Sequence, residues 1–186
     1  MKISDNRPKR VAVLATDGFE QSELLESAGA MQGSGAAVAI VTPDGGSIRG
    51  WKDQDWGQAI KADVSLAEAD PAEYDALLLP GGVLNSDKLR TSTPAQDFVR
   101  HFFQQDKPVF AICHGAQILI DAGLAGGRTL TSYEAIAADL VNAGADWRDE
   151  EVVEDGHLIT SRKPDDLPAF NAAICRALGL KEAQPA

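Results

Sequence analysis

Positive charge is what this chain lacks most clearly. Its 17 lysines and arginines are outnumbered by 28 aspartates and glutamates, which gives a formal net charge of -11 at pH 7. A chain of this charge repels a phosphate backbone, and no local cluster of basic residues offsets the repulsion. We therefore expect no nucleic-acid partner.

Long apolar runs are also missing. The first run, residues 11–15, is too short for the core of a signal peptide, and no other stretch approaches the ~18 apolar residues of a membrane span. The two cysteines, Cys113 and Cys175, provide no disulfide framework, and a free thiol is kept most easily in a reducing compartment. The expected location is the cytoplasm, with no membrane contact.

Motifs for cofactors and metals are absent as well. The glycines form neither the dinucleotide-binding pattern nor the phosphate-loop pattern. Neither the two cysteines nor the three histidines are spaced as metal ligands. We expect no cofactor and no metal ion.

The chain does contain a regular alternation of short apolar runs and segments of helical period. This alternation is typical of an α/β fold with a parallel sheet, and the length suits a single domain over residues 1–186. The expected strands are 11–16, 36–42, 76–79 and 108–112, with a hairpin at 151–154 and 157–161. The expected helices are 20–33, 94–105, 114–122, 134–142 and 165–178, while residues 50–70 receive no assignment.

Cys113 is the main chemical candidate, in the sequence Ala111-Ile112-Cys113-His114-Gly115. A buried strand turns there directly into a helix, and the small residues on either side leave room for the sharp turn of a nucleophile elbow. A thiol at a helix N-terminus is close to free backbone N–H groups and to the positive end of the helix dipole, which favour the thiolate. The alternative is a small buried cysteine at a strand end.

Three histidines are candidate bases. His114 is adjacent to Cys113, but successive helical side chains diverge by about 100°, so contact between them depends on distortion of the turn. Otherwise His114 is a histidine at a helix start, bonded to some other carboxylate. His101 and His157 fit solvated surface positions better.

The ends of two other strands supply further candidates. Glu20 follows the first strand, and the carboxyl ends of neighbouring parallel strands line one crevice, so Glu20 and Cys113 can meet there. A partly buried carboxylic acid would donate a hydrogen bond to the thiolate, whereas an acid in a first helical turn would simply complement the helix dipole. The N–H groups of Gly82 and His114 either form an oxyanion hole or belong to an ordinary Pro-Gly turn and helix start.

Four segments together resemble the ThiJ/PfpI superfamily, and in particular its PfpI intracellular-protease-like branch. They are Asp17-Gly18-Phe19-Glu20, Leu79-Pro80-Gly81-Gly82, Ala111-Ile112-Cys113-His114-Gly115-Ala116-Gln117 and Ser161-Arg162-Lys163-Pro164-Asp165-Asp166-Leu167-Pro168. The resemblance spans about residues 9–180. It implies a flavodoxin-like three-layer α/β sandwich with a mostly parallel central sheet and with Cys113 on the nucleophile elbow. It also implies that Glu20 hydrogen bonds to the thiolate and that the Gly82 and His114 N–H groups form the oxyanion hole.

The resemblance implies further site residues and an assembly. In peptidase-like members an acid after the Pro-Gly-Gly turn reaches across a subunit interface to orient the histidine, and its nearest match is Asp87, one methylene shorter than the usual glutamate. Tyr133 matches a position near the active site and is a possible ligand contact; the simpler account is an exposed tyrosine in a turn. A homodimer or higher homo-oligomer is expected.

The expected function is that of a stress-protective enzyme in which Cys113 attacks a carbonyl and His114 transfers protons. The resemblance allows a cysteine-dependent hydrolase of the intracellular peptidase kind, or a glyoxalase or deglycase. Its partners would be small carbonyl compounds, glycated proteins or peptides. The alternative is a non-catalytic redox sensor or chaperone-like stress-response protein that uses oxidation of Cys113.

Overall fold

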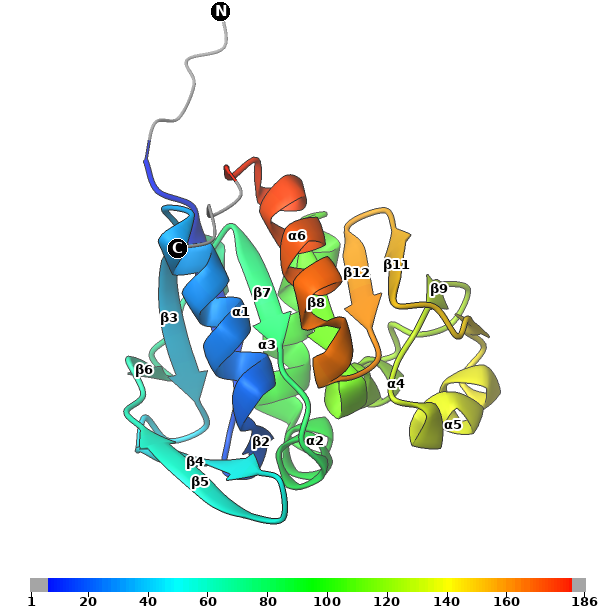
Figure 1. Cartoon of the computed structure of the whole chain (residues 1–186), viewed down its shortest axis with the longest axis horizontal. Helices are drawn as coiled ribbons and strands as arrows, with labels where there is room; N and C mark the ends of the chain where they lie inside the picture. The colour runs from blue at the N-terminus through cyan, green and yellow to red at the C-terminus, as the bar shows by residue number, and fades with distance from the viewer. Residues whose placement is uncertain (1–6, 182–186) are drawn as a thin grey trace, which may run out of the picture.

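A seven-stranded sheet forms the middle layer of the molecule (Figure 1). The computed structural model describes residues 7–181, so the ends of the predicted domain, 1–6 and 182–186, lie outside the described residues. In spatial order the strands are β11 (Val152–Asp155), β12 (Leu158–Ser161), β8 (Val109–Ile112), β7 (Ala76–Leu79), β1 (Arg10–Leu14), β3 (Ala37–Thr42) and β6 (Val64–Ser65). Neighbouring strands in this sheet are parallel except β11 and β12, which confirms the predicted mostly parallel sheet.

The strand order contains a switch point between β1 and β7. From β1 the chain continues to β3 on one side, and it later crosses to β7, β8 and β12 on the other. This is the flavodoxin-like order, in which ligands bind in the crevice outside the carboxyl ends of the strands at the switch point. The fold therefore predicts a ligand site at the loops that follow β1, β7 and β8.

Helices cover both faces of the sheet, as predicted for a three-layer sandwich (Figure 1). On one face, α1 (Gln21–Gly33) packs against α6 (Leu167–Leu178). The helices that pack together on the other face are α2 (Val83–Arg90), α3 (Thr93–Gln104) and α4 (Gln117–Asp121).

The side chains of β1 alternate between the two cores. Val11 and Val13 join the core that contains Phe170 of α6, whereas Ala12 and Leu14 join the core that contains the phenylalanines of α3. Because both faces of the sheet are buried, its inner strands read as continuous apolar runs rather than alternating ones. This is the pattern from which those strands are predicted.

Two strands of a second, three-stranded sheet lie wholly or partly in residues 50–70, for which the sequence predicts no element. Its strands are β2 (Phe19–Glu20), β4 (Ile48–Lys52) and β5 (Asp55–Ile60). β4 and β5 form an antiparallel hairpin whose turn contains Asp53 at φ 55°, and Trp51 packs edge-to-face on Trp56 with ring centroids 5.5 Å apart. Most of β5 is exposed, so it has no apolar run that would mark it as a strand.

Several predicted helices begin as one turn of 3-10 helix. η2 (Cys113–Ala116) precedes α4, η3 (Glu134–Ile136) precedes α5 (Ala137–Asn142), and η4 (Pro164–Asp166) precedes α6. The remaining short elements are η1 (Pro71–Glu73), β9 (Thr129–Leu130) and β10 (Asp146–Trp147). Helix α2 has no counterpart among the predicted elements, because two of the three residues on its buried face, Asn85 and Ser86, are polar.

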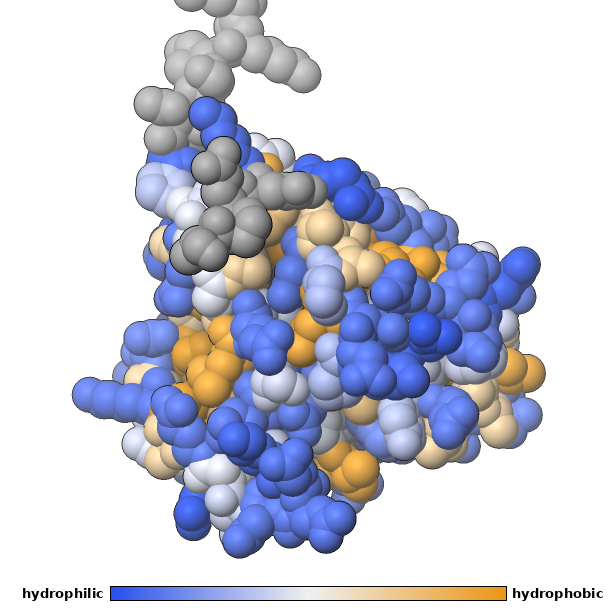
Figure 2. All heavy atoms as spheres, viewed as in Figure 1, coloured by the Kyte–Doolittle hydropathy of each residue, from blue (hydrophilic) through white to orange (hydrophobic). Residues whose placement is uncertain are grey.

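The surface is mostly hydrophilic in the view of Figure 2, with apolar side chains in small separate areas. Two exposed apolar residues, Val83 and Leu84, stand at the start of α2. No helix within residues 7–181 is long and apolar enough to cross a membrane.

Candidate active site

Cys113 lies on a strained turn between β8 and η2. Its φ is +60°, in the left-handed region that residues other than glycine rarely adopt, while Ile112 before it is still extended. A Cβ at Gly115 would lie 3.0 Å from the Pro80 carbonyl oxygen and closer still to that of Leu79, so the turn requires a glycine there. These features confirm the predicted nucleophile elbow.

A buried acid, Glu23, stands beside Cys113. Glu23 lies in the first turn of α1, is fully buried, and accepts the Gly81 N–H at its Oε2 over 2.7 Å. The Cys113 side chain interacts with the same carboxyl, and Oε1 of that carboxyl accepts no hydrogen bond from the described residues. Oε1 is therefore the oxygen placed to carry a proton.

The protonation of Glu23 follows from its surroundings. Burial raises the pKa of Glu23 from its ordinary 4.5 to about 8; the Gly81 hydrogen bond lowers it, and repulsion by Glu20 raises it further. At neutral pH Glu23 is mostly protonated. It can then donate a hydrogen bond to the Cys113 sulfur.

Glu20 has a different role from the expected one. Its carboxylate caps the N-terminus of α1, where it accepts the Ser22 N–H at 3.1 Å and the Ser22 hydroxyl at 2.7 Å. The expected hydrogen bond from Glu20 to the thiol is thus corrected to Glu23. The reason is helical geometry: an N-cap side chain turns back to the free N–H groups of its own helix, whereas Glu23 shares the buried face of α1 with Ser27.

The surroundings of Cys113 act in both directions on the expected thiolate. Burial raises the pKa of the Cys113 thiol and an ionised Glu23 would raise it further, while the N–H groups of His114 and Gly82 act in the opposite direction. The helical segments that follow are short, four residues in η2 and five in α4, so their dipoles contribute little. Cys113 and Glu23 together carry at most one negative charge at neutral pH, and a base must remove the thiol proton.

His114 is positioned to be that base. Its Nδ1 lies 3.3 Å from Cys113 Sγ, a contact that sequence adjacency alone did not guarantee. Burial lowers the pKa of the His114 imidazole, so the ring is neutral at pH 7, and its Nε2–H tautomer accepts a proton at Nδ1. The strained turn at Cys113 is what brings the two neighbouring side chains together.

Tyr133 packs against the ring face of the His114 imidazole. Its ring stacks on His114 with centroids 5.1 Å apart and planes inclined by 28°, and its N–H donates to the Cys113 carbonyl oxygen at 3.2 Å. Tyr133 is 36% exposed, so it stands at the edge of the site and is partly accessible to solvent. Its contact with a ligand stays a prediction.

Two backbone N–H groups, of Gly82 and His114, donate to the Cys113 sulfur. Gly82 has a φ of +93°, and a Cβ there would lie 2.6 Å from the backbone nitrogen of Glu20. A Cβ at Gly81 would lie 2.7 Å from the Cβ of Cys113. Glycine at both positions therefore lets the backbone approach the nucleophile. These are the two donors expected to form the oxyanion hole, a role that stays a prediction.

The other candidate residues lie outside this cluster. Asp87 is exposed on α2 and makes no hydrogen bond to His114 within residues 7–181. Its expected role is in a neighbouring subunit, so the role stays a prediction. The remaining side chains have other contacts: His101 with Phe102, His157 with Phe103 and Asp106, and Cys175 with Ser34.

A hollow of about 230 Å³ opens beside the elbow. It is lined by Ser132, Tyr133, Glu134, Asp149, Arg162 and Lys163. Tyr133 is the residue that this hollow shares with the Cys113 site. No group of three or more histidine, cysteine, aspartate or glutamate side chains in the described part of the chain could hold a metal ion.

The model of the DJ-1/PfpI family matches residues 9–177. The chain belongs to the DJ-1/PfpI family. This agrees with the resemblance to the ThiJ/PfpI superfamily that the four sequence segments carry, and with the elbow geometry around Cys113.

Members of the DJ-1/PfpI family that match this chain differ in their names. An Escherichia coli (strain K12) relative, named protein/nucleic acid deglycase 2, is 46% identical over 173 residues, or 92% of this chain and 98% of the relative. A Bacillus subtilis (strain 168) relative, YraA, named provisionally as a cysteine protease, is 42% identical over 163 residues, or 88% of this chain and 94% of the relative. The crystal structure of Drosophila melanogaster DJ-1beta matches with a TM-score of 0.84 at 29% identity and covers 95% of this chain and 92% of that one.

Proposed function

We propose that this DJ-1/PfpI protein is a cysteine-dependent glyoxalase or deglycase that acts on small carbonyl compounds and their adducts with amines. The observation that carries the proposal is the cluster of Cys113, Glu23 and His114. It combines a strained nucleophile, a buried acid with a pKa of about 8, and a neutral imidazole 3.3 Å from the sulfur. The name of the 46% identical relative supports the same reaction class.

These residues suit the conversion of a 2-oxoaldehyde such as methylglyoxal to a hydroxy acid. His114 takes the thiol proton and the sulfur attacks the aldehyde carbon, which forms a hemithioacetal whose oxygen faces the Gly82 and His114 N–H groups. Transfer of a proton from that carbon to the neighbouring one gives a thioester, which water hydrolyses to lactate and the free thiol. One water is consumed and no oxidant is needed.

An amine adduct reaches the same hemithioacetal intermediate through a different first step. In the adduct of methylglyoxal with an amine, the former aldehyde carbon carries both a hydroxyl group and the amine nitrogen. The sulfur forms its bond to that carbon as the C–N bond breaks, and the amine leaves with the proton that His114 holds. The hemithioacetal that results is the same, so a single site serves both reactions.

Proteolysis has less support from this arrangement. A peptidase-type triad needs an acid that orients His114, and the expected acid, Asp87, would have to come from a second subunit. Val83 and Leu84, exposed beside Gly82 on the same helix, support a homo-oligomer that would place α2 at an interface. The name of YraA keeps the hydrolase as the alternative within this site.

Methylglyoxal consumption with measured lactate formation tests the proposal. We expect Cys113→Ser to lower kcat/KM by at least about 100-fold, because it removes the nucleophile. Cys175→Ser is the matched control and should keep full activity, since Cys175 is buried in α6 away from the site. Turnover unchanged in Cys113→Ser, or absent from the wild-type protein, would reject the proposal.

A second candidate function is an oxidation-responsive protein. The protonated Glu23 carboxyl beside the sulfur favours it, because that carboxyl can donate a hydrogen bond to an oxygen of a Cys113 sulfinate. Mild peroxide followed by peptide mass spectrometry should then oxidise Cys113 in preference to Cys175. Equal oxidation of the two cysteines would remove this candidate.

The partners, location and physiological role that we expect for this protein stay predictions. The charge of -11 supports the absence of a nucleic-acid partner, although the name of the Escherichia coli relative includes nucleic acids. Glycated proteins and peptides are proposed substrates alongside small carbonyl compounds. A cytoplasmic location and a stress-protective role complete the proposal.

A further inference from the structure

The pairing of β8 with β12 places Arg162, which lines the hollow, next to Cys113. In the parallel pair of β8 and β12, Ile112 is opposite Ser161, so the next residues, Cys113 and Arg162, leave the sheet side by side. Neighbouring strands lie about 4.8 Å apart. Tyr133 stacks on the imidazole of the site and also lines the hollow. A molecule attached at the sulfur can therefore extend past Tyr133 toward the hollow.

Four charged side chains line the hollow, two of each sign, and one oppositely charged pair among them is engaged. Arg162 Nη1 donates to Asp149 at 2.8 Å. Arg162 Nε also donates to the buried Asp166 at 2.9 Å. Arg162 is thus held in place by two carboxylates, and both Arg162 and Asp149 are already engaged in ion pairs within the protein.

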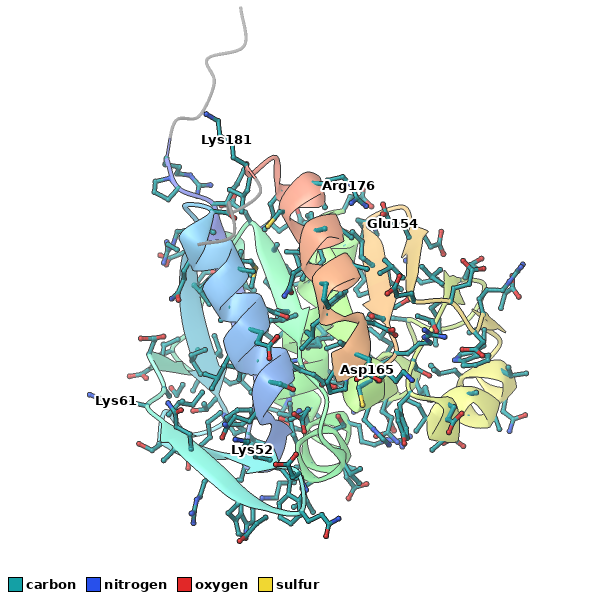
Figure 3. All side chains as sticks on the ribbon, in the orientation of Figure 1. Lys52, Lys61, Glu154, Asp165, Arg176 and Lys181 are labelled. Carbon is teal, nitrogen blue, oxygen red and sulfur yellow. The ribbon has the colours of Figure 1, made fainter. Side chains whose placement is uncertain are left out.

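Lys163 and Glu134 are the two charges that remain available. Lys163 Nζ has one loose ion pair, 3.6 Å from Asp165, and both side chains are exposed. Figure 3 shows Asp165 at the start of α6, at the end of the sheet where the strands finish. Glu134 makes no ion pair within residues 7–181, and although it lines the same hollow as Lys163, the two do not pair with each other.

Because Lys163 and Glu134 line one hollow without pairing with each other, the hollow favours a ligand that carries both a negative and a positive charge. A ligand with negative charge only would meet Glu134, and one with positive charge only would meet Lys163. A ligand with both charges satisfies the two side chains at once. The head group of a free α-amino acid, with its ammonium and carboxylate on one carbon, has this character, whereas a residue inside a protein presents neutral amides there.

We propose that the hollow is a leaving-group subsite for the zwitterionic head group of a free amino acid, with Lys163 on the carboxylate and Glu134 on the ammonium. This inference rests on the proposed function and assigns it, among amine adducts, a preference for those of free amino acids, such as lysine modified at its side-chain amine. The side chain extends from the hollow past Tyr133 to Cys113. The sulfur forms its bond to the adduct carbon, the C–N bond breaks, and free lysine is released with the proton from His114.

A binding titration followed by NMR tests the subsite without turnover. The probes are L-lysine, L-norleucine and Nα-acetyl-L-lysine amide, added to the 15N-labelled wild-type protein. L-Lysine and L-norleucine share the head group, so both should bind and shift the amide signals of residues 132–134 and 162–163. The blocked lysine keeps the side-chain amine but has no charged head group, and it should bind about tenfold more weakly.

Two neutral variants assign the charges. Lys163→Gln and Glu134→Gln should each weaken L-lysine binding by roughly fivefold, as expected for one exposed charge pair, and should leave the weak binding of the blocked lysine unchanged. Lys61→Gln, which removes an exposed lysine that follows β5, is the control and should bind L-lysine as the wild type does (Figure 3). The kcat/KM for methylglyoxal, which has no head group, should stay within about twofold of wild type in all three variants.

The outcomes separate this inference from the proposed function. Equal affinity for lysine and blocked lysine, or unchanged lysine affinity in both hollow variants, would overturn the subsite. Lack of methylglyoxal turnover by the wild type would overturn the proposed function, and the binding titration would then decide the subsite independently.

Discussion

The Glu23 carboxyl and the Cys113 thiol are buried against each other at the carboxyl end of the central sheet. Burial makes the charged form of both groups less favourable, and an ionised Glu23 would further disfavour the Cys113 thiolate. The Gly81 N–H donates to Oε2 of the carboxyl, which leaves Oε1 as the oxygen that carries its proton. The pair therefore stores a proton at neutral pH that can stabilise a negative charge on sulfur once His114 has removed the thiol proton.

The pH dependence of activity should report both partners of this mechanism. The kcat/KM for methylglyoxal is expected to fall on the acid side as His114 becomes protonated, at a pH lower than the ordinary imidazole pKa of 6.5, because burial lowers the pKa of His114. It should also fall above about pH 8, where ionised Glu23 repels the thiolate. In Glu23→Gln the alkaline limb should move to higher pH while the acid limb stays. An alkaline limb at the same pH in Glu23→Gln would contradict the assignment.

The stability of the protein should also depend on Glu23. Its pKa is higher in the folded chain, about 8, than its ordinary 4.5, so the folded state binds the extra proton between these values. The free energy of unfolding should consequently decrease as the pH rises from 4.5 to 8, by at most about 5 kcal/mol. Urea unfolding at pH 5 and pH 8 measures this decrease, and Glu23→Gln should remove most of it.

Glu20→Gln is the matched control for this prediction. Glu20 lies three residues earlier and caps α1 through Ser22. Its neutral variant should lose part of a cap, about 1 kcal/mol or less, and should keep the pH dependence of the wild type. A pH dependence that persists in Glu23→Gln and disappears in Glu20→Gln would return the catalytic acid to the position that the sequence suggested.

The sequence predicts those parts of the molecule that are governed by local pattern. The inner strands are buried on both faces and read as apolar runs, and the small residues around Cys113 mark the turn. The choice between Glu20 and Glu23 depends on the phase of α1 relative to the sheet. A signal was present, because Glu23 stands four residues before Ser27 and eight before Met31, on one buried stripe of the helix.

Other features depend on contacts between distant segments. The exposed hairpin of β4 and β5 pairs through its backbone and carries no apolar run. The hollow forms where Tyr133 and Glu134 meet Arg162 and Lys163, residues that a linear pattern does not join. The stack of Tyr133 on His114 likewise appears only once the loop after β9 is placed beside the elbow.

The stack of Tyr133 on His114 should increase kcat because it holds the imidazole in position. Tyr133→Phe keeps the ring and should retain at least about half of the wild-type kcat, whereas Tyr133→Ala frees the imidazole and should lower kcat by about tenfold. Tyr133 is partly exposed, so both variants should fold with similar unfolding midpoints. The steady-state kcat, measured with the unfolding midpoint, separates a positioning effect from loss of structure. Equal kcat in the two variants would show that the stack does not orient the base.

The close approach of the Gly82 backbone to neighbouring segments can be tested with an alanine substitution, for which Gly35→Ala is the control. Gly82 and Gly35 have nearly the same positive φ, +93° and +96°, so alanine meets the same backbone strain at both positions. At Gly35 nothing lies within 4 Å of an added Cβ, whereas at Gly82 it would clash with the Gly18 carbonyl oxygen and lie 2.6 Å from the Glu20 nitrogen. Gly35→Ala should therefore cost about 1 kcal/mol in the free energy of unfolding.

Gly82→Ala should cost at least about 2 kcal/mol more than Gly35→Ala, because the loop must move to relieve the clash. That movement would also pull the Gly82 N–H away from the Cys113 sulfur, so residual methylglyoxal turnover should fall by at least about tenfold in Gly82→Ala and stay unchanged in Gly35→Ala. Chemical denaturation and kcat/KM measured on the same preparations give both quantities. If both variants lost the same stability and neither lost activity, the close approach of the Gly82 backbone to the nucleophile would have no part in catalysis.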